Sequence, residues 1–202
     1  MDKPVLVDVR RLDARFLFDI KYATQDNFTG KQLYPIAKCL LLPEVGQMVV
    51  KAQAYLDTHH MGYVLMFKDC YRPHHIQRLM WDVVKGTPQQ SYVANPHSQT
   101  GSVHNYGAAV DLTLATLHGQ EVDMGTPYDT FDALAQPRYE DKFLNEGKLS
   151  AKQVEHRRIL RSAMVKGGGF KMIRNEWWHF DAWQGDTLRR RYKILDVPLE
   201  DF

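Results

Sequence analysis

The stretch SVHNYGAAVDLTL, residues 102–114, carries a histidine and an aspartate on either side of a glycine. After Gly107, apolar residues recur at every second position, which is the period of a β-strand. Asp111 lies in the middle of this apolar strand. A carboxylate buried there without a partner would be costly, so the pattern indicates a cation beside Asp111. His104, just before the strand, indicates that this cation is a metal ion.

A metal held by an imidazole and a carboxylate needs a further ligand, and His179 near the end of the chain supplies one. His104, Asp111 and His179 form the kind of ligand set that catalytic zinc uses, with one position left for water. A carboxylate must then accept the proton of that water, and Glu176 is the candidate. Residues three apart on a regular strand face opposite sides, so the strand must begin after Glu176 or bulge. Arg72 is the candidate cation for the tetrahedral oxyanion.

The composition is that of an ordinary globular protein. The chain has 202 residues, of which 44% are hydrophobic and 25% charged, and its formal net charge is +2. This length suits a single domain over residues 1–202 with a substantial core. The small net charge indicates neither a nucleic-acid partner nor a membrane surface. No apolar run approaches the roughly 18 residues of a membrane span.

The cysteines and the first residues bear on the compartment in which the protein works. Cys39 and Cys70 form no CxxC pair, and we expect two buried free thiols, with a disulfide as the alternative. Residues 1–4 do not begin the basic and then apolar pattern of a secretory leader. We therefore expect a cytoplasmic protein, unless a leader has been removed. The oligomeric state is left open.

The rest of the chain indicates an α+β fold, with a mainly antiparallel sheet and a few packed helices. The pattern predicts a helix from Pro43 to His59, a strand from Tyr63 to Lys68, and a second helix beginning at Pro73. The inner face of this second helix is expected to carry four apolar residues: Ile76, Leu79, Met80 and Val83.

The C-terminal part adds a helix and two strands. A capping-box sequence at Ser150 predicts a helix to about Lys166, which ends at a run of glycines. Residues 170–173 and 177–182 are predicted to form an antiparallel pair of strands. Between these elements, Gly86 to Thr100 is predicted to form a long loop, of the length that is often functional.

Two motifs together resemble the signature of the zinc D-alanyl-D-alanine dipeptidases. They are SxHxxGxAxD at residues 102–111 and ExWH at residues 176–179. These enzymes, known from vancomycin resistance, share a fold with D-Ala-D-Ala carboxypeptidases, lysostaphin-type endopeptidases and the hedgehog signalling domain. Further stretches resemble the dipeptidases in particular, namely YATxDNFTG at 22–30, DxYRP at 69–73 and MG followed by Asp129. The resemblance covers residues 16 to 183.

The resemblance implies a hedgehog/D-Ala-D-Ala-peptidase-like fold and one Zn²⁺ per chain. His104, Asp111 and His179 match the zinc ligands of the family. Glu176 matches its general base, and Arg72 matches the residue that stabilises the tetrahedral intermediate.

The resemblance also implies a set of residues for substrate binding. Asp129 falls where the family holds the free amine of the substrate. Ser102 and Tyr22 fall at substrate-contact positions, and Asp69 falls where a carboxylate supports the arginine. A buried anion that pairs with an ammonium would select dipeptides, because an N-acylated substrate would leave Asp129 unpaired.

The expected activity is therefore hydrolysis of D-Ala-D-Ala or a close dipeptide. A peptidoglycan D,D- or L,D-carboxypeptidase or endopeptidase of the same fold is the alternative. A non-haem iron oxygenase also uses two histidines and a carboxylate, but it has no role for Glu176. A non-catalytic binding module would not need Glu176 or Arg72. Residues 86–100 and 136–147 have no clear counterpart in the family, so the preferred dipeptide and the physiological role stay open.

Overall fold

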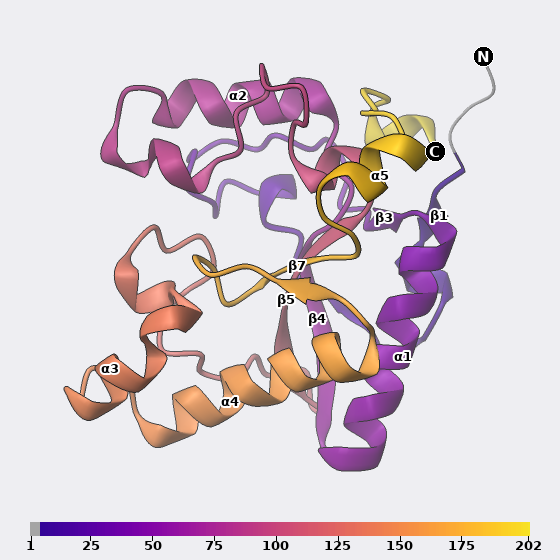
Figure 1. Ribbon diagram of the computed structural model, residues 1–202. Helices are drawn as coiled ribbons and strands as arrows, with labels where there is room; N and C mark the ends of the chain where they lie inside the picture. Colours follow the sequence, from indigo (N-terminus) through magenta and orange to yellow (C-terminus); the bar gives the residue numbers. More distant parts are fainter. Residues whose placement is uncertain (1–4) are drawn as a thin grey trace.

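The computed structural model describes residues 5–202, so residues 1–4, on which the expectation about a leader rests, lie outside the described residues (Figure 1). Within the described part, the main sheet has five strands in the order β2-β4-β5-β7-β6. These strands are β2 (Leu17–Phe18), β4 (Tyr63–Asp69), β5 (Ala109–Thr116), β7 (His179–Asp181) and β6 (Lys171–Met172). Only β2 runs parallel to its neighbour, and the other pairs among these strands are antiparallel. A small second sheet pairs β1 (Val7–Asp8) with β3 (Leu40–Leu41).

The helices surround this sheet. They are α1 (Pro43–His59), α2 (His74–Val84), α3 (Glu140–Asn145), α4 (Ala151–Ser162) and α5 (Asp186–Arg191). In Figure 1, α2 lies across the top of the view, α4 lies along the bottom, and α1 lies at the lower right. The expected α+β class and its mainly antiparallel sheet are therefore confirmed. Among the described residues, every helix is too short or too polar to cross a bilayer.

Local sequence signals set the bounds of the long helices. Pro43 occupies the first turn of α1, where its missing N–H has no intrahelical partner to lose. The capping box is formed at α4, where Ser150 Oγ accepts from the N–H of Gln153 and the Gln153 side chain accepts from Ser150. After α4, a π-helical turn over Ala163–Gly167 ends this segment at the glycine run, as expected.

The central strand β5 is buried on both faces. On its two sides it pairs with β4 and β7, and α4 packs against it while α1 packs against β4. A strand with this placement carries a nearly continuous apolar run. The polar side chains that it does carry must find partners inside the protein.

The expectation of free thiols at Cys39 and Cys70 is wrong, because the two residues form a disulfide. Cys39 comes directly before β3, and Cys70 directly follows β4. A backbone hydrogen bond from Tyr71 N to Leu40 O holds these two segments side by side. Their Cα atoms lie 5.1 Å apart, within the range that a disulfide spans.

The expected inner face of α2 is correct for Ile76 and Met80 but wrong for Leu79 and Val83, which are 49% and 45% exposed. Gln77 is fully buried instead. The buried stripe of α2 also includes Trp81 and Val84. Gln77 can be buried in this stripe because its side chain accepts a hydrogen bond from Arg72.

Candidate active site

Three adjacent strands bring acidic and imidazole side chains into one row. In the sheet, Asp111 of β5 is paired with His179 of β7 on one side and with Asp69 of β4 on the other. The register of β4 shifts between Phe67 and Asp69, which is a β-bulge. In a regular ladder, Asp69 would lie on the opposite face from Asp111, so the bulge brings both to the same face.

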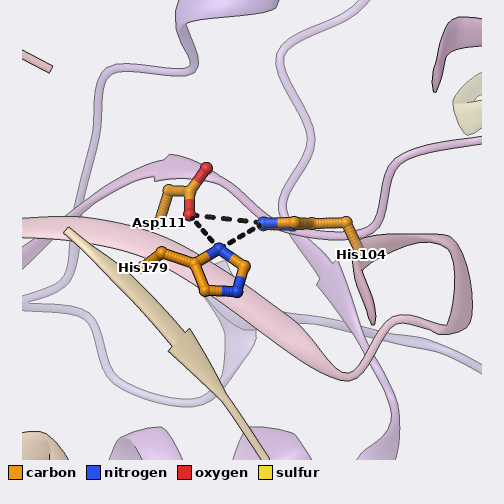
Figure 2. A group of neighbouring side chains, drawn as sticks. All are labelled: His104, Asp111 and His179. Atoms are coloured by element: carbon orange, nitrogen blue, oxygen red, sulfur yellow. Dashed lines mark hydrogen bonds and ion pairs between the residues drawn. The ribbon is translucent and has the colours of Figure 1, made fainter. Parts of the chain in front are cut away.

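The candidate ligand atoms converge on one point (Figure 2). His104 Nε2 lies 3.2 Å from Asp111 Oδ1 and 3.1 Å from His179 Nδ1. His179 Nδ1 lies 2.9 Å from the same Asp111 oxygen. Ligand atoms around a tetrahedral zinc, at about 2.0–2.2 Å from the metal, are separated by similar distances.

The outer nitrogen of each histidine fixes the ring for metal binding. His104 Nδ1 lies 2.6 Å from the carbonyl oxygen of Cys70, and His179 Nε2 lies 2.7 Å from Asp181 Oδ1. Both acceptors require an N–H on that side of the ring, so in the neutral rings the lone pairs point toward the Asp111 oxygen. Two lone pairs and a carboxylate oxygen at these distances repel one another unless a cation lies between them. The site therefore fits a metal ion.

Asp111 is held as an anion. Burial alone would raise its pKa, but when no metal is bound, protonated His104 and His179 take the place of the cation and hold the pKa of this carboxyl well below its ordinary value. Its second oxygen, Oδ2, accepts a hydrogen bond from the Tyr128 hydroxyl at 2.8 Å and lies 3.7 Å from Arg72 Nη2. Oδ1 of Asp111 therefore faces the two imidazoles, whereas Oδ2 is held by Tyr128 and lies near Arg72.

His104 belongs to a short 3₁₀ helix at Val103–Tyr106 that precedes β5. Ser102 caps this helix, and its hydroxyl oxygen accepts from His104 N. Gly107 ends the helix with a φ of 69°. A side chain at Gly107 would be strained in that conformation and would lie 3.4 Å from the backbone nitrogen of Leu42, so the motif requires glycine here.

Arg72 reaches the site from the turn between β4 and α2 and is almost fully buried. Asp69 Oδ2 accepts from both Arg72 Nε and Nη2, at 2.9 and 2.6 Å. Gln77 Oε1 accepts from Arg72 Nη1 at 2.9 Å. Asp69 itself is fully buried and also accepts from the Tyr34 hydroxyl, so it lies behind Arg72 and not in the wall of the cavity. This agrees with a supporting role for Asp69 and not with a direct substrate contact.

Glu176 lies just before β7, which begins at His179. The condition inferred from the sequence, that the strand must begin after Glu176, is therefore met. Burial raises the pKa of Glu176 to about 7; His179 opposes this rise and Asp111 adds to it. A carboxyl group with this pKa can both accept and release a proton near neutral pH.

Asp129 is the one non-glycine residue with a positive φ among residues 5–202, at 59°. Its Oδ2 accepts a hydrogen bond from the Tyr22 hydroxyl at 2.8 Å. Burial, with a contribution from Asp111, raises the pKa of Asp129 well above its ordinary value. A left-handed backbone at a non-glycine residue is uncommon and often occurs at functional sites, although aspartate adopts it more readily than most residues.

A cavity of about 270 Å³ joins these groups. It is lined by the three candidate ligands together with Glu176, Arg72, Ser102, Tyr22 and Asp129. A larger cavity of about 610 Å³ shares Asp129 but none of the candidate ligands. Because the titratable groups converge in the smaller cavity, that cavity is the candidate active site.

Comparisons with known proteins agree with this geometry. A family model described as D-ala-D-ala dipeptidase, of the peptidase M15 family, matches residues 2–198. The chain belongs to this D-Ala-D-Ala dipeptidase family. It is 32% identical to the D-alanyl-D-alanine dipeptidase of Escherichia coli K12 over 89% of this chain and 86% of the relative. The Enterococcus faecium and Enterococcus faecalis D-alanyl-D-alanine dipeptidases are 31% and 29% identical, over 81% and 91% of this chain and 84% and 88% of the relatives.

The D-Ala-D-Ala dipeptidase family is a family of metallopeptidases, which agrees with the cluster of His104, Asp111 and His179. The cavity contains every catalytic or substrate-binding residue expected from the sequence except Asp69. Two residues that support the ligands were not expected, namely Tyr128 and Asp181. Asp181 could have been found, because it lies two positions after His179 on a strand and therefore on the same face.

Proposed function

We propose that this chain is a zinc-dependent dipeptidase that hydrolyses D-Ala-D-Ala or a close dipeptide, with residues 1–202 forming a single domain. The observation that carries this proposal is the convergence of His104 Nε2, Asp111 Oδ1 and His179 Nδ1 in one cavity with Glu176. Its membership in a family of D-Ala-D-Ala dipeptidases supports the choice of substrate.

Zinc is the proposed metal because two imidazoles and one carboxylate, with a remaining position for water, are the usual protein ligands of catalytic zinc. His104, Asp111 and His179 would hold it, and the Cys70 carbonyl and Asp181 would keep the two rings oriented. When bound, the metal would polarise the scissile carbonyl and lower the pKa of a water molecule to near neutrality.

Glu176 is the proposed general base. It would accept the proton of the attacking water and pass it to the nitrogen of the leaving D-alanine. Burial raises its pKa to about 7 in the metal-free protein, and a bound metal ion would lower this value and so favour the carboxylate form that accepts the proton.

Arg72 is proposed to stabilise the oxyanion that forms when water adds to the peptide carbonyl. It lines the cavity, and Nη2 lies 3.7 Å from Asp111 Oδ2, close to the proposed metal position. The two hydrogen bonds from Arg72 Nε and Nη2 to Asp69 Oδ2 keep the guanidinium in a fixed orientation, so little reorganisation is needed during the reaction.

Asp129 is proposed to bind the free ammonium of the substrate. In the cavity without substrate, its charge is disfavoured by burial, and an ammonium would remove this cost. The Tyr22 hydroxyl would orient the carboxylate. Ser102 also lines the cavity, and its hydroxyl hydrogen is suited to donate to a substrate oxygen while its own oxygen caps His104.

The decisive experiment measures free D-alanine released from D-Ala-D-Ala by the zinc-loaded protein, beside N-acetyl-D-Ala-D-Ala. Cleavage of the free dipeptide alone is the expected result. Cleavage of both substrates would favour the carboxypeptidase alternative. No cleavage of either, with zinc bound, would contradict the proposed activity.

The cytoplasmic location expected from the sequence stays a prediction. The Cys39–Cys70 disulfide weighs against it, because disulfides form and persist mainly in oxidising compartments. Alkylation of free thiols in cells lysed directly into denaturant tests this point, because both cysteines are buried in the folded chain. A cytoplasmic, reduced protein would be labelled at both cysteines, and an oxidised one at neither.

A further inference from the structure

Residues 86–100, for which the sequence motifs indicated no clear counterpart in the family, reach the candidate cavity and contact Gln136 at the start of residues 136–147. Within the first segment, residues 91–94 line the cavity. The ring of Tyr92 stacks on Phe131, with ring centres 5.1 Å apart and planes 13° from parallel. Gln136, the first residue of the second segment, donates from Nε2 to the Tyr92 hydroxyl at 2.7 Å. Residues 91–94 and Phe131 thus form one wall of the cavity, and Gln136 supports this wall from outside the cavity lining.

The same wall is tied to the catalytic side of the cavity. Gln77 Nε2 donates to the carbonyl oxygen of Ala94 at 2.8 Å, while Gln77 Oε1 accepts from Arg72. Both anchoring side chains are buried, Gln77 at 0% and Gln136 at 6% exposure. Because buried amides hold the segment at the Tyr92 hydroxyl and at the Ala94 carbonyl, it is a fixed part of the cavity.

Aromatic contacts connect this wall to Asp129, the proposed partner of the substrate ammonium. Phe131 contacts Phe28 with ring centres 5.0 Å apart, and Phe28 meets Tyr22 edge to face at 6.2 Å. Tyr22 in turn donates to Asp129. Phe28, Tyr92 and Phe131 line the same cavity as Asp129. A substrate whose ammonium pairs with Asp129 would therefore have the side chain of its first residue in the space that these rings bound.

We propose that Tyr92 is a specificity-determining residue that limits the size of the side chain on the amino-terminal residue of the dipeptide. This depends on the proposed function, since it takes Asp129 as the partner of the ammonium. The two residues then have separate tasks: Asp129 selects a free amine by charge, and Tyr92 excludes a bulky first side chain by its volume.

The test compares kcat/KM for D-Ala-D-Ala, D-Phe-D-Ala and N-acetyl-D-Ala-D-Ala in the zinc-loaded wild type and in Tyr92→Ala. The wild type should prefer D-Ala-D-Ala to D-Phe-D-Ala. In Tyr92→Ala this preference should fall by about tenfold or more, the scale on which pocket volume discriminates between side chains. The N-acetylated substrate should stay uncleaved, because Asp129 is unchanged.

Matched variants separate the effect of the volume of Tyr92 from the effects of its hydrogen bond and its stacking. Tyr92→Phe loses the hydrogen bond from Gln136 but keeps the ring and its stack on Phe131. Its preference for D-Ala-D-Ala over D-Phe-D-Ala should therefore stay near that of the wild type. Phe131→Leu removes the stacking partner of Tyr92 and should lower the preference even if Tyr92→Ala does not fold. Tyr139→Ala removes a half-buried tyrosine that meets Phe143 edge to face outside the cavity, and it should change nothing.

The outcomes distinguish this proposal from the one on which it depends. A wild type that does not cleave D-Ala-D-Ala would contradict the proposed function. A wild type that does, with an unchanged preference in both Tyr92→Ala and Phe131→Leu, would overturn the role of Tyr92. Cleavage of N-acetyl-D-Ala-D-Ala by Tyr92→Ala would overturn the division of tasks between Tyr92 and Asp129.

Discussion

Glu176 is the residue on which the proposed proton transfer depends most directly. Glu176→Gln keeps the size of the side chain but cannot accept a proton, so kcat for D-Ala-D-Ala should fall by about 10²–10⁴. Zinc content, measured on the same preparation, should not change. Glu155→Gln, at an exposed position on α4, is the control and should retain full activity. Full activity in Glu176→Gln would contradict the assigned role.

The raised pKa of Glu176 also has a consequence for stability in the metal-free protein. Between pH 4.5 and about 7, the folded chain keeps a proton that the unfolded chain has released. The contribution of Glu176 to the free energy of unfolding therefore falls as pH rises through this range and is constant above it.

Glu176→Gln removes this dependence. After treatment with a chelator, the variant should be more stable than the wild type at pH 8, by about 1–3 kcal/mol, and nearly equal to it at pH 4. Urea unfolding at the two pH values measures the difference. An equal difference at both values would show that the carboxyl of Glu176 does not have a raised pKa.

Tyr128 supports the ligand Asp111 through a single hydrogen bond at 2.8 Å. Tyr128→Phe removes only the hydroxyl, and the zinc affinity should fall by about 10–100-fold, as for other residues that orient a metal ligand. Competition with a chromophoric chelator measures this affinity, and Tyr139→Phe serves as the control. An unchanged affinity would mean that Asp111 is oriented by its strand alone.

At the scale of secondary-structure elements, the site depends on the edge at which β4, β5 and β7 align. Asp111 and His179 face one another because their strands pair at that position, and the bulge in β4 adds Asp69 to the same row. The turn after β4 then carries Arg72, and Asp69 holds its guanidinium. The paired strands therefore position the candidate ligands Asp111 and His179, the 3₁₀ helix before β5 positions His104, and the turn after β4 supplies Arg72.

The Cys39–Cys70 disulfide connects the turn after β4 to the residue before β3. It closes a loop between residues that are 31 positions apart. Replacement of both cysteines by serine should lower the free energy of unfolding by about 3–4 kcal/mol, since the unfolded chain gains the freedom of that loop. Urea unfolding with and without a reductant measures this. The reductant should shift the wild type to the midpoint of the double variant and leave the variant itself unchanged; a wild type that does not respond would contradict the prediction.

At the scale of the whole molecule, metal binding should be coupled to stability, because the ligands come from a 3₁₀ helix and two strands that assemble only in the folded chain. Free zinc at a hundred times its dissociation constant should stabilise the protein by about 2.7 kcal/mol. A chelator should lower Tm and abolish activity, and added zinc should restore both. The Tm of His104→Ala should respond only weakly to zinc. A wild type whose Tm is the same with and without zinc would contradict the proposed site.

Short-range patterns were sufficient to place the long helices and the central strand and to predict a candidate metal site. His104 and Asp111 lie in one short stretch, and Glu176 and His179 lie in another, so residue type and spacing alone are enough to indicate a metal site. Local spacing determines which residues share a face of a strand or a turn of a helix, and this information is contained in the order of the residues.

The folded chain was needed for contacts between distant segments. The sequence did not predict the disulfide between Cys39 and Cys70 or the bulge that brings Asp69 to the face of Asp111. It also did not predict that Tyr92 stacks on Phe131 at the cavity. Asp129 has a left-handed backbone in the folded chain. The neighbouring residues Tyr128 and Asp129 both contact the Tyr22 hydroxyl there. Such contacts depend on how whole elements pack together, and no local period or spacing encodes them.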